Sequence, residues 1–83
     1  MTTVLHFSFE VNMMLSPKEI VGSNIKRIRQ NQGITGSDLA RLLLCSQQHV
    51  SRIERGLVRL NIEQIQLVAD RLNVSISLLL RGV

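Results

Sequence analysis

The chain has few of the residues that build disulfide-bonded, metal-binding or membrane-embedded proteins. Its 83 residues include one cysteine, one proline and two aromatic residues, both phenylalanine. A single cysteine excludes an intramolecular disulfide framework, and its apolar neighbours favour a buried Cys45 side chain. No apolar run approaches the roughly 18 residues of a membrane span, and the first residues lack the features of a secretory signal. We therefore expect one cytoplasmic protein with no membrane partner.

Residues suited to catalysis are also sparse. Asp38, Glu63 and Asp70 each stand alone in the sequence, and nothing in their spacing suggests a pair of carboxylates for acid–base chemistry. No serine has a neighbouring base as in a hydrolase, and the glycines lack the strand context of a phosphate-binding loop. His49 has no second metal ligand near it in the sequence. The sequence predicts a protein that is not an enzyme and needs neither metal nor cofactor.

Positive charge is what the chain has in excess. Ten lysines and arginines oppose six acidic residues, which gives a formal net charge of +4. The stretch from Lys26 to Arg59 is more basic still, because its only acidic residues are Asp38 and Glu54. A concentrated basic segment suits a polyanionic partner such as nucleic acid.

Apolar residues recur at helical spacing through most of the chain, and residues that cap helices precede each such segment. Ser16-Pro17-Lys18-Glu19 reads as a capping box with proline at the first helical position, and Thr35 is followed by Asp38 in the same arrangement. With almost no aromatic residues, the core must be packed by leucine, isoleucine and valine. The predicted helices span about 17–31, 36–43, 47–55, 62–72 and 76–80, opened by Ser16, Thr35, Ser46, Asn61 and Ser75.

Residues 4–14 follow a different period. Apolar and polar residues alternate there, which is typical of a half-buried β-strand. The apolar members are Leu5, Phe7, Phe9, Val11 and Met13. A lone strand needs a partner, and the same strand of a second subunit would supply one across a twofold axis. Two alternatives to a strand stay open: the segment is a tail without strand structure, or it is an extension upstream of a true start at Met13 or Met14. We therefore divide the chain into an N-terminal strand or tail, 1–15, available for dimerisation, and a main domain, 16–83.

The stretch from Ser46 to Gly56 has the composition of a helix that reads DNA. Val50 and Ile53 lie three residues apart, so one face can be anchored to a core while the other points outward. Glutamine side chains can bond bidentately to adenine edges in the major groove, and two of them occupy the first turn. Gly56 follows as a natural helix terminator.

From Val21 to Leu80 the chain resembles the Cro/CI-type helix-turn-helix family, also called XRE-like. The matching pieces are Val21-Gly22 with Ile25, Ile28 and Arg29, then Gly33-Ile34-Thr35, Leu39-Ala40, Ser51 to Gly56, and Leu72-Asn73-Val74-Ser75. The start Ser46-Gln47-Gln48 is similar to that of the reading helix in a lambdoid phage repressor. The resemblance implies an all-α, five-helix helix-turn-helix domain, to which the alternation over 4–14 adds an N-terminal β-strand extension.

The resemblance also implies roles for individual side chains. It implies base contacts from Gln47, Gln48 and Arg52, with His49 and Ser51 as further candidates. It implies phosphate contacts from Arg55 and Arg59, and the charges of Lys26 and Arg41 would add salt-sensitive attraction to phosphates. At Gly36 a phosphate contact is either lost or made by the backbone amide at the start of the helix. The resemblance further implies a structural ion pair between Arg29 and Glu54, which would fix the reading helix to the scaffold.

Three positions depart from the family pattern. Gly36 replaces a glutamine that usually touches the DNA backbone, and Leu60 replaces a common proline. Leu44 stands where the turn between the two helices usually has glycine. Either this leucine adopts a positive φ angle, or the turn differs from that of the family.

Together these features predict a sequence-specific double-stranded DNA-binding regulator of transcription, acting as repressor or activator. A homodimer on a palindromic operator is expected, because two reading helices would span half-sites about 34 Å apart. The residues expected to dimerise are Phe7, Phe9, Val11, Val58, Leu60 and Leu78. RNA polymerase or another regulator is a possible protein partner. The alternative is a protein-interaction module, or an antitoxin-like partner-binding protein, on the same fold.

Overall fold

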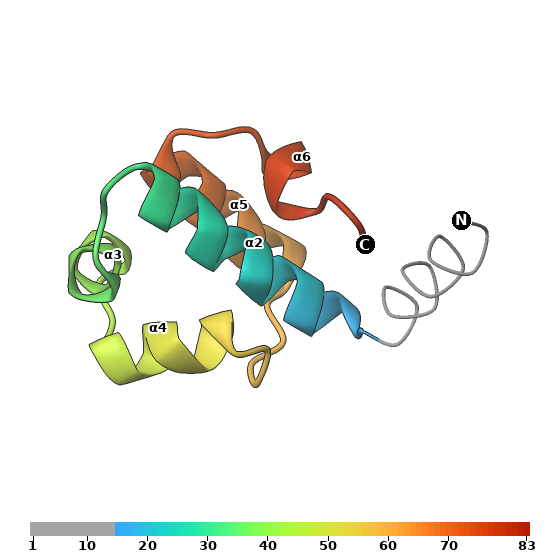
Figure 1. Ribbon diagram of the computed structural model, residues 1–83, viewed down its shortest axis with the longest axis horizontal. Coiled ribbons are helices and arrows are strands. Elements are labelled where there is room, and N and C mark those ends of the chain that lie inside the picture. Colours follow the sequence, from blue (N-terminus) through green and yellow to red (C-terminus); the bar gives the residue numbers. More distant parts are fainter. Residues whose placement is uncertain (1–14) are drawn as a thin grey trace, which may run out of the picture.

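The computed structural model describes residues 15–83, which form five helices joined by short loops (Figure 1). The helices are α2 (Pro17–Asn31), α3 (Gly36–Leu43), α4 (Gln47–Glu54), α5 (Ile62–Leu72) and α6 (Ile76–Leu79). These bounds agree with the five predicted helices to within one residue at every end. In this part of the chain, no helix combines the length and the apolar character that crossing a membrane requires.

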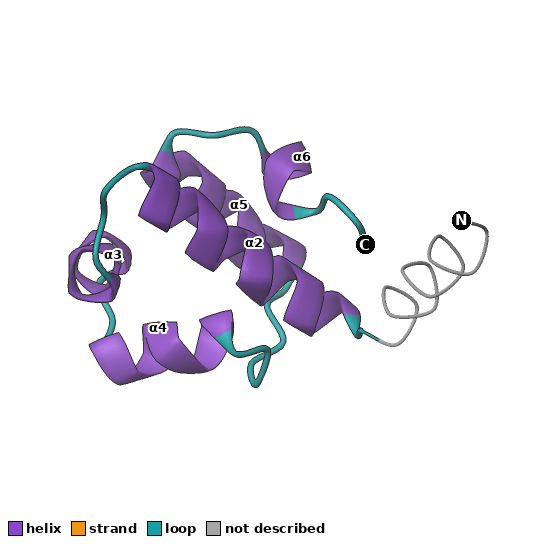
Figure 2. Ribbon diagram, viewed as in Figure 1, coloured by secondary structure: helices purple, strands orange, loops and turns teal. Residues whose placement is uncertain are grey.

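The N-terminal β-strand in the predicted fold class is wrong. Residues 15–83 contain helices and loops but no strand (Figure 2), and the segment 4–14 on which the strand was expected lies outside the described residues. The physical reason is that a strand must pair with another strand, and the described domain offers only helices as neighbours. Over residues 15–83 the fold class is therefore all-α.

One central helix, α2, organises the domain. Figure 1 shows α5 and α6 on one side of α2 and α4 on the other, with α3 at the end where α2 leads into the helix-turn-helix pair. Each helix contributes one of the largest fully buried side chains, which are Ile25, Leu39, Val50, Leu72 and Leu79. As the composition predicts, the core of this part of the chain is aliphatic.

Local side-chain hydrogen bonds define where the helices begin. Ser16 and Glu19 form a reciprocal capping box at α2, and Thr35 with Asp38 does the same at α3. In each box the backbone N–H of the cap residue donates to the carboxylate, which lowers the pKa of Glu19 and of Asp38. Ser46 accepts from the backbone N–H of the residue three positions on, at 3.0 Å, and so caps α4. The ends of the helices therefore follow from nearby sequence.

The backbones of α2 and α4 come into direct contact at Gly22. A Cβ atom at this position would lie 2.2 Å from the carbonyl oxygen of Ile53 and 3.0 Å from that of Glu54. Because both obstructing atoms belong to the backbone, no change of rotamer would make room for a side chain. The close approach explains a glycine inside a helix, where it ordinarily lowers helix stability.

The turn between α3 and α4 contains a leucine in the left-handed region. Leu44 has φ 56° and ψ 44° and ends α3, so the family's turn geometry is kept with leucine in place of glycine. Its side chain is 89% exposed and therefore gains little from packing. The next residue, Cys45, packs partly against the core, and burial raises the pKa of its thiol.

Gly22→Ala should lower the free energy of unfolding by about 2 kcal/mol, because the added methyl group forces α4 away from α2. Urea denaturation measures the change. Ser23→Ala, an exposed substitution on the same helix, is the matched control and should stay within about 0.5 kcal/mol of the parent protein. Equal stability of the Gly22→Ala variant and the parent would contradict a backbone contact at this point.

Leu44→Gly should instead raise the free energy of unfolding, by about 0.5–1 kcal/mol. Glycine reaches the left-handed region without steric cost, and this gain exceeds the added entropy of the unfolded chain. Thermal denaturation should show a higher Tm for this variant. The control Leu42→Gly, at a helical position of α3, should lower the Tm. A fall in Tm for both variants would show that Leu44 is not strained.

Candidate nucleic-acid interface

The helix α4 has one buried face and one exposed face. Val50 and Ile53 are buried against the core. All the side chains that were predicted to contact bases are exposed, namely Gln47, Gln48, His49, Ser51 and Arg52. Figure 1 shows α4 along one edge of the domain, where this exposed face can meet a large partner. The structure therefore brings the five predicted base-contacting residues together on one helix.

The cap of α4 determines how its first turn is presented. Ser46 satisfies the backbone N–H of His49, so the helix begins at Gln47 and the two glutamines occupy its first turn. Both side chains extend from the end of the helix that precedes the buried Val50. An amide side chain at such a position can both donate and accept, which is the pattern that an adenine edge requires.

A bidentate ion pair ties α4 to α2. Arg29 Nε lies 2.6 Å from Glu54 Oε2, and Arg29 Nη2 lies 2.9 Å from Glu54 Oε1. The remaining terminal nitrogen, Nη1, donates to the carbonyl oxygen of Ile34 at 3.0 Å. The two side chains are 13% and 6% exposed. One arginine thus joins α2, the loop before α3 and the end of α4.

Burial and charge make this pair a fixed part of the scaffold. The hydrogen bonds to Glu54 raise the pKa of the Arg29 guanidinium, an effect that outweighs desolvation. Parallel bonds from a planar guanidinium to a carboxylate restrict both position and orientation. Because Arg29 offsets its charge, the carboxylate of Glu54 does not stand as an isolated negative charge beside the exposed basic residues.

The predicted phosphate-contacting residues lie in different settings. Lys26, Arg55 and Arg59 are exposed, on α2, just after α4 and in the loop before α5. Arg41 is exposed too, but it pairs with Asp38 one turn earlier on α3. The Arg55 side chain bends back, with its Nε donating to the carbonyl oxygen of Ser51 at 3.3 Å. Basic side chains thus flank α4 on both sides along the chain.

Gly36 is the first residue of α3. A Cβ atom there would lie 3.8 Å from Arg29 Nη2, which is an ordinary van der Waals distance. The packing around this position therefore leaves room for a Cβ atom and does not require glycine. What Gly36 offers a phosphate is its backbone N–H at the N-terminus of a helix.

The predicted dimerisation residues do not form one patch in the described structure. Val58 and Leu60 are half-buried in the loop after α4, and both line one cavity. Leu78 is half-buried on α6 against the core. Phe7, Phe9 and Val11 lie outside the described residues. The most exposed apolar residue near this loop is Leu57, at 58%.

Asn24 is a buried polar residue that the sequence reading overlooked. It is 4% exposed, and its Nδ2 donates to the carbonyl oxygens of Leu79 and Arg81, both at 2.9 Å. It holds the C-terminal end of the chain against α2. Its spacing from Val21 and Ile28, three and four residues away, places it on the buried stripe and was the signal available.

Comparison with known protein families shows to which family this chain belongs. The helix-turn-helix family HTH_3 matches residues 25–79, which is most of the described chain. The chain therefore belongs to this XRE-type helix-turn-helix family, and it is a DNA-binding regulator of transcription. Among curated proteins, no relative matches its sequence.

Solved structures of bacterial regulators share the fold. ClgR, a clp gene regulator from Corynebacterium glutamicum, is 25% identical, with 82% of this chain and 87% of that chain covered and a TM-score of 0.77. NHTF, a hypothetical transcription factor from Neisseria, is 26% identical over 78% and 75% of the chains, with a TM-score of 0.72. An HTH_3 family transcriptional regulator from Vibrio cholerae is 25% identical, and the match covers 76% of this chain and 35% of that chain with a TM-score of 0.70.

Glu54→Ala should lower the free energy of unfolding by about 3 kcal/mol, because it leaves the mostly buried Arg29 guanidinium without its partner. Chemical denaturation measures the loss. The control Glu63→Ala removes an exposed carboxylate from the first turn of α5 and should cost at most about 1 kcal/mol. Equal effects of the two substitutions would show that the pair does not fix α4.

Proposed function

We propose that this protein binds specific sequences in double-stranded DNA as a homodimer, with α4 of each copy in the major groove. The observation that carries the proposal is the division of α4 into an anchored face, Val50 and Ile53, and an exposed face with two glutamines and Arg52. Gln47 and Gln48 would contact adenine edges, and Arg52 would contact guanine. His49 and Ser51 are further base contacts in this proposal.

Phosphate contacts would set the position of the domain on the duplex. Lys26, Arg55 and Arg59 are the exposed cations best suited to this task, with Arg41 also available where a phosphate displaces Asp38. The Gly36 amide at the start of α3 would bind a phosphate in place of the side chain that this position lacks. Such contacts supply affinity without selecting a sequence, and they weaken as salt rises.

Dimerisation would lengthen the DNA site that the protein contacts, because one domain alone covers few base pairs. With eight residues, α4 is about 12 Å long and covers only a few base pairs. Two copies related by a twofold axis would read two half-sites about 34 Å apart, which makes the operator palindromic. The loop after α4, with the exposed Leu57 beside Val58 and Leu60, is the apolar surface we propose for this contact.

Gln47→Ala and Gln48→Ala should each weaken binding to the preferred duplex by about 10- to 100-fold, since each removes one bidentate contact. Selection from a random duplex library identifies the preferred sequence, and a binding titration then measures the loss. The control Gln66→Ala removes an exposed glutamine on α5 and should leave affinity unchanged. Arg55→Ala should weaken binding to all sequences alike and lower the salt slope by about one.

The same experiments can overturn the proposal. Salt-dependent binding with no enriched sequence would remove specific DNA reading and favour a protein-interaction module. For the homodimer, the mass of the complex on the selected palindrome should correspond to two chains per duplex. One chain per palindrome at saturation would contradict dimeric binding.

A further inference from the structure

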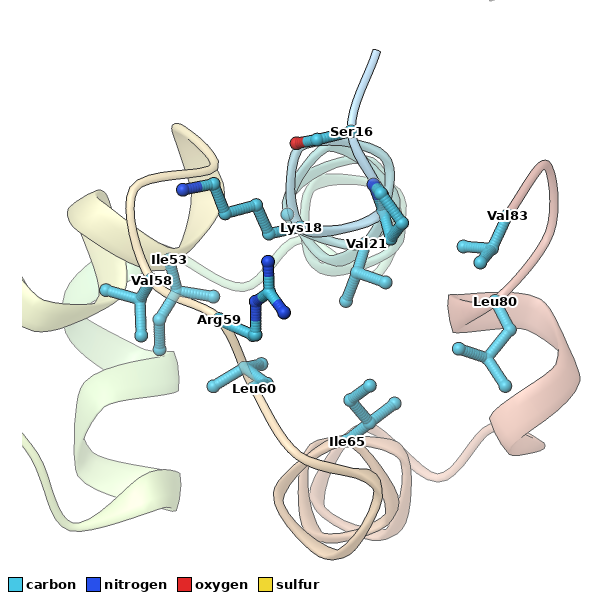
Figure 3. A pocket seen from close by; sticks show the side chains of 12 residues that line it. Ser16, Lys18, Val21, Ile53, Val58, Arg59, Leu60, Ile65, Leu80 and Val83 are labelled. Atoms are coloured by element: carbon cyan, nitrogen blue, oxygen red, sulfur yellow. The ribbon is translucent and has the colours of Figure 1, made fainter. Parts of the chain in front are cut away.

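An apolar cavity of about 280 Å³ opens where α2, α4, α5 and α6 meet (Figure 3). Its walls come from segments far apart in the sequence, and most are aliphatic. The aliphatic lining consists of Val21, Ile53, Val58, Leu60, Ile65, Leu80 and Val83. An apolar cavity of about 150 Å³ is enough to hold a benzene ring, so this one can hold the side chain of a phenylalanine.

Two cations border the cavity. Lys18 on α2 and Arg59 in the loop after α4 are both exposed, and Figure 3 shows their side chains in the gap between these two elements. Neither forms a salt bridge within residues 15–83, where the pairs are Arg29–Glu54 and Arg41–Asp38. The cavity thus combines an apolar interior with a positively charged edge. An occupant that fits it has an apolar ring next to a carboxylate.

The segment of this chain that precedes the described residues has this chemistry. Residues 1–14 contain both phenylalanines of the protein, Phe7 and Phe9, and a single acidic residue, Glu10, directly after the second. They join the described chain at Leu15, and the next two residues, Ser16 and Pro17, line the cavity. Phe9 lies six positions before Leu15, a reach of up to roughly 20 Å.

We propose that the segment Phe7–Val11 binds in this cavity of its own chain, with a phenylalanine ring among the aliphatic side chains. Glu10 then lies near Lys18 and Arg59 at the charged edge. The same chain is favoured as the donor because a short tether gives its segment an effective concentration on the order of millimolar, which a second copy reaches only at high protein concentration. In this proposal the two phenylalanines complete the core of one domain instead of a contact between subunits.

Nuclear Overhauser effects in the full-length protein test this directly, without DNA. Because Phe7 and Phe9 are its only phenylalanines and it has no tyrosine or tryptophan, their ring protons can be recognised in the spectrum. We expect effects from one ring to the methyl groups of Val58, Leu60 and Leu80. Isotope-filtered spectra of a mixed labelled and unlabelled sample separate contacts within one chain from those between chains. No such effects, or effects only between chains, would overturn the proposal.

The double variant Phe7→Ala/Phe9→Ala should lower the Tm by about 5 °C or more, because the cavity loses its aromatic occupant. His6→Ala, on the polar side of the same alternation, is the matched control and should leave the Tm unchanged. Equal Tm values for the double variant and the parent would also overturn the proposal. Both measurements use the protein without DNA. Their outcomes therefore test the occupant of the cavity separately from the proposed DNA binding.

Discussion

The contact between α2 and α4 is the constraint on which the proposed function depends. With eight residues, α4 is shorter than the roughly 12–15 residues that an isolated helix needs in water, so its conformation requires tertiary support. That support comes at two points: the backbone approach at Gly22 and the Arg29–Glu54 pair seven residues along α2. Two separated points fix both the distance and the direction of α4, which makes the exposed face a rigid surface.

Much of the fold could be predicted because its signals are local. Three helices begin at a cap residue, Ser16, Thr35 or Asn61, that exchanges hydrogen bonds with the residue three positions later. These capping hydrogen bonds form in the structure. Predictions that needed distant information were weaker. Ile62 stands at helical spacing from the buried Ile65 but is 61% exposed, because it begins α5 at the margin of the core. The alternation over 4–14 matches the period of a strand, but a strand also needs a pairing partner, and a local pattern does not contain that information.

The candidate site shows the same limit. Resemblance to a family indicated which residues of α4 face outward, and Val50 with Ile53 marked the opposite face. Spacing alone could not reveal that Gly22 meets a carbonyl oxygen 31 residues later, or that Lys18 and Arg59 border one cavity. Such facts depend on how helices cross. The φ angle of Leu44 could be predicted only in part. Its position between the two helices indicated a turn with positive φ, but a leucine side chain disfavours positive φ.

The separation of the two faces of α4 has an evolutionary consequence. Side chains that hold the helix, Val50, Ile53 and Glu54, point into the domain, whereas Gln47 and Gln48 take no part in its core. Substitutions on the outer face therefore leave folding almost untouched. Under the proposed function, descendants of this protein can change the DNA sequence that they prefer one side chain at a time, while the domain stays intact. The scaffold is then the part that is conserved, and the outer face of α4 is the part that diverges.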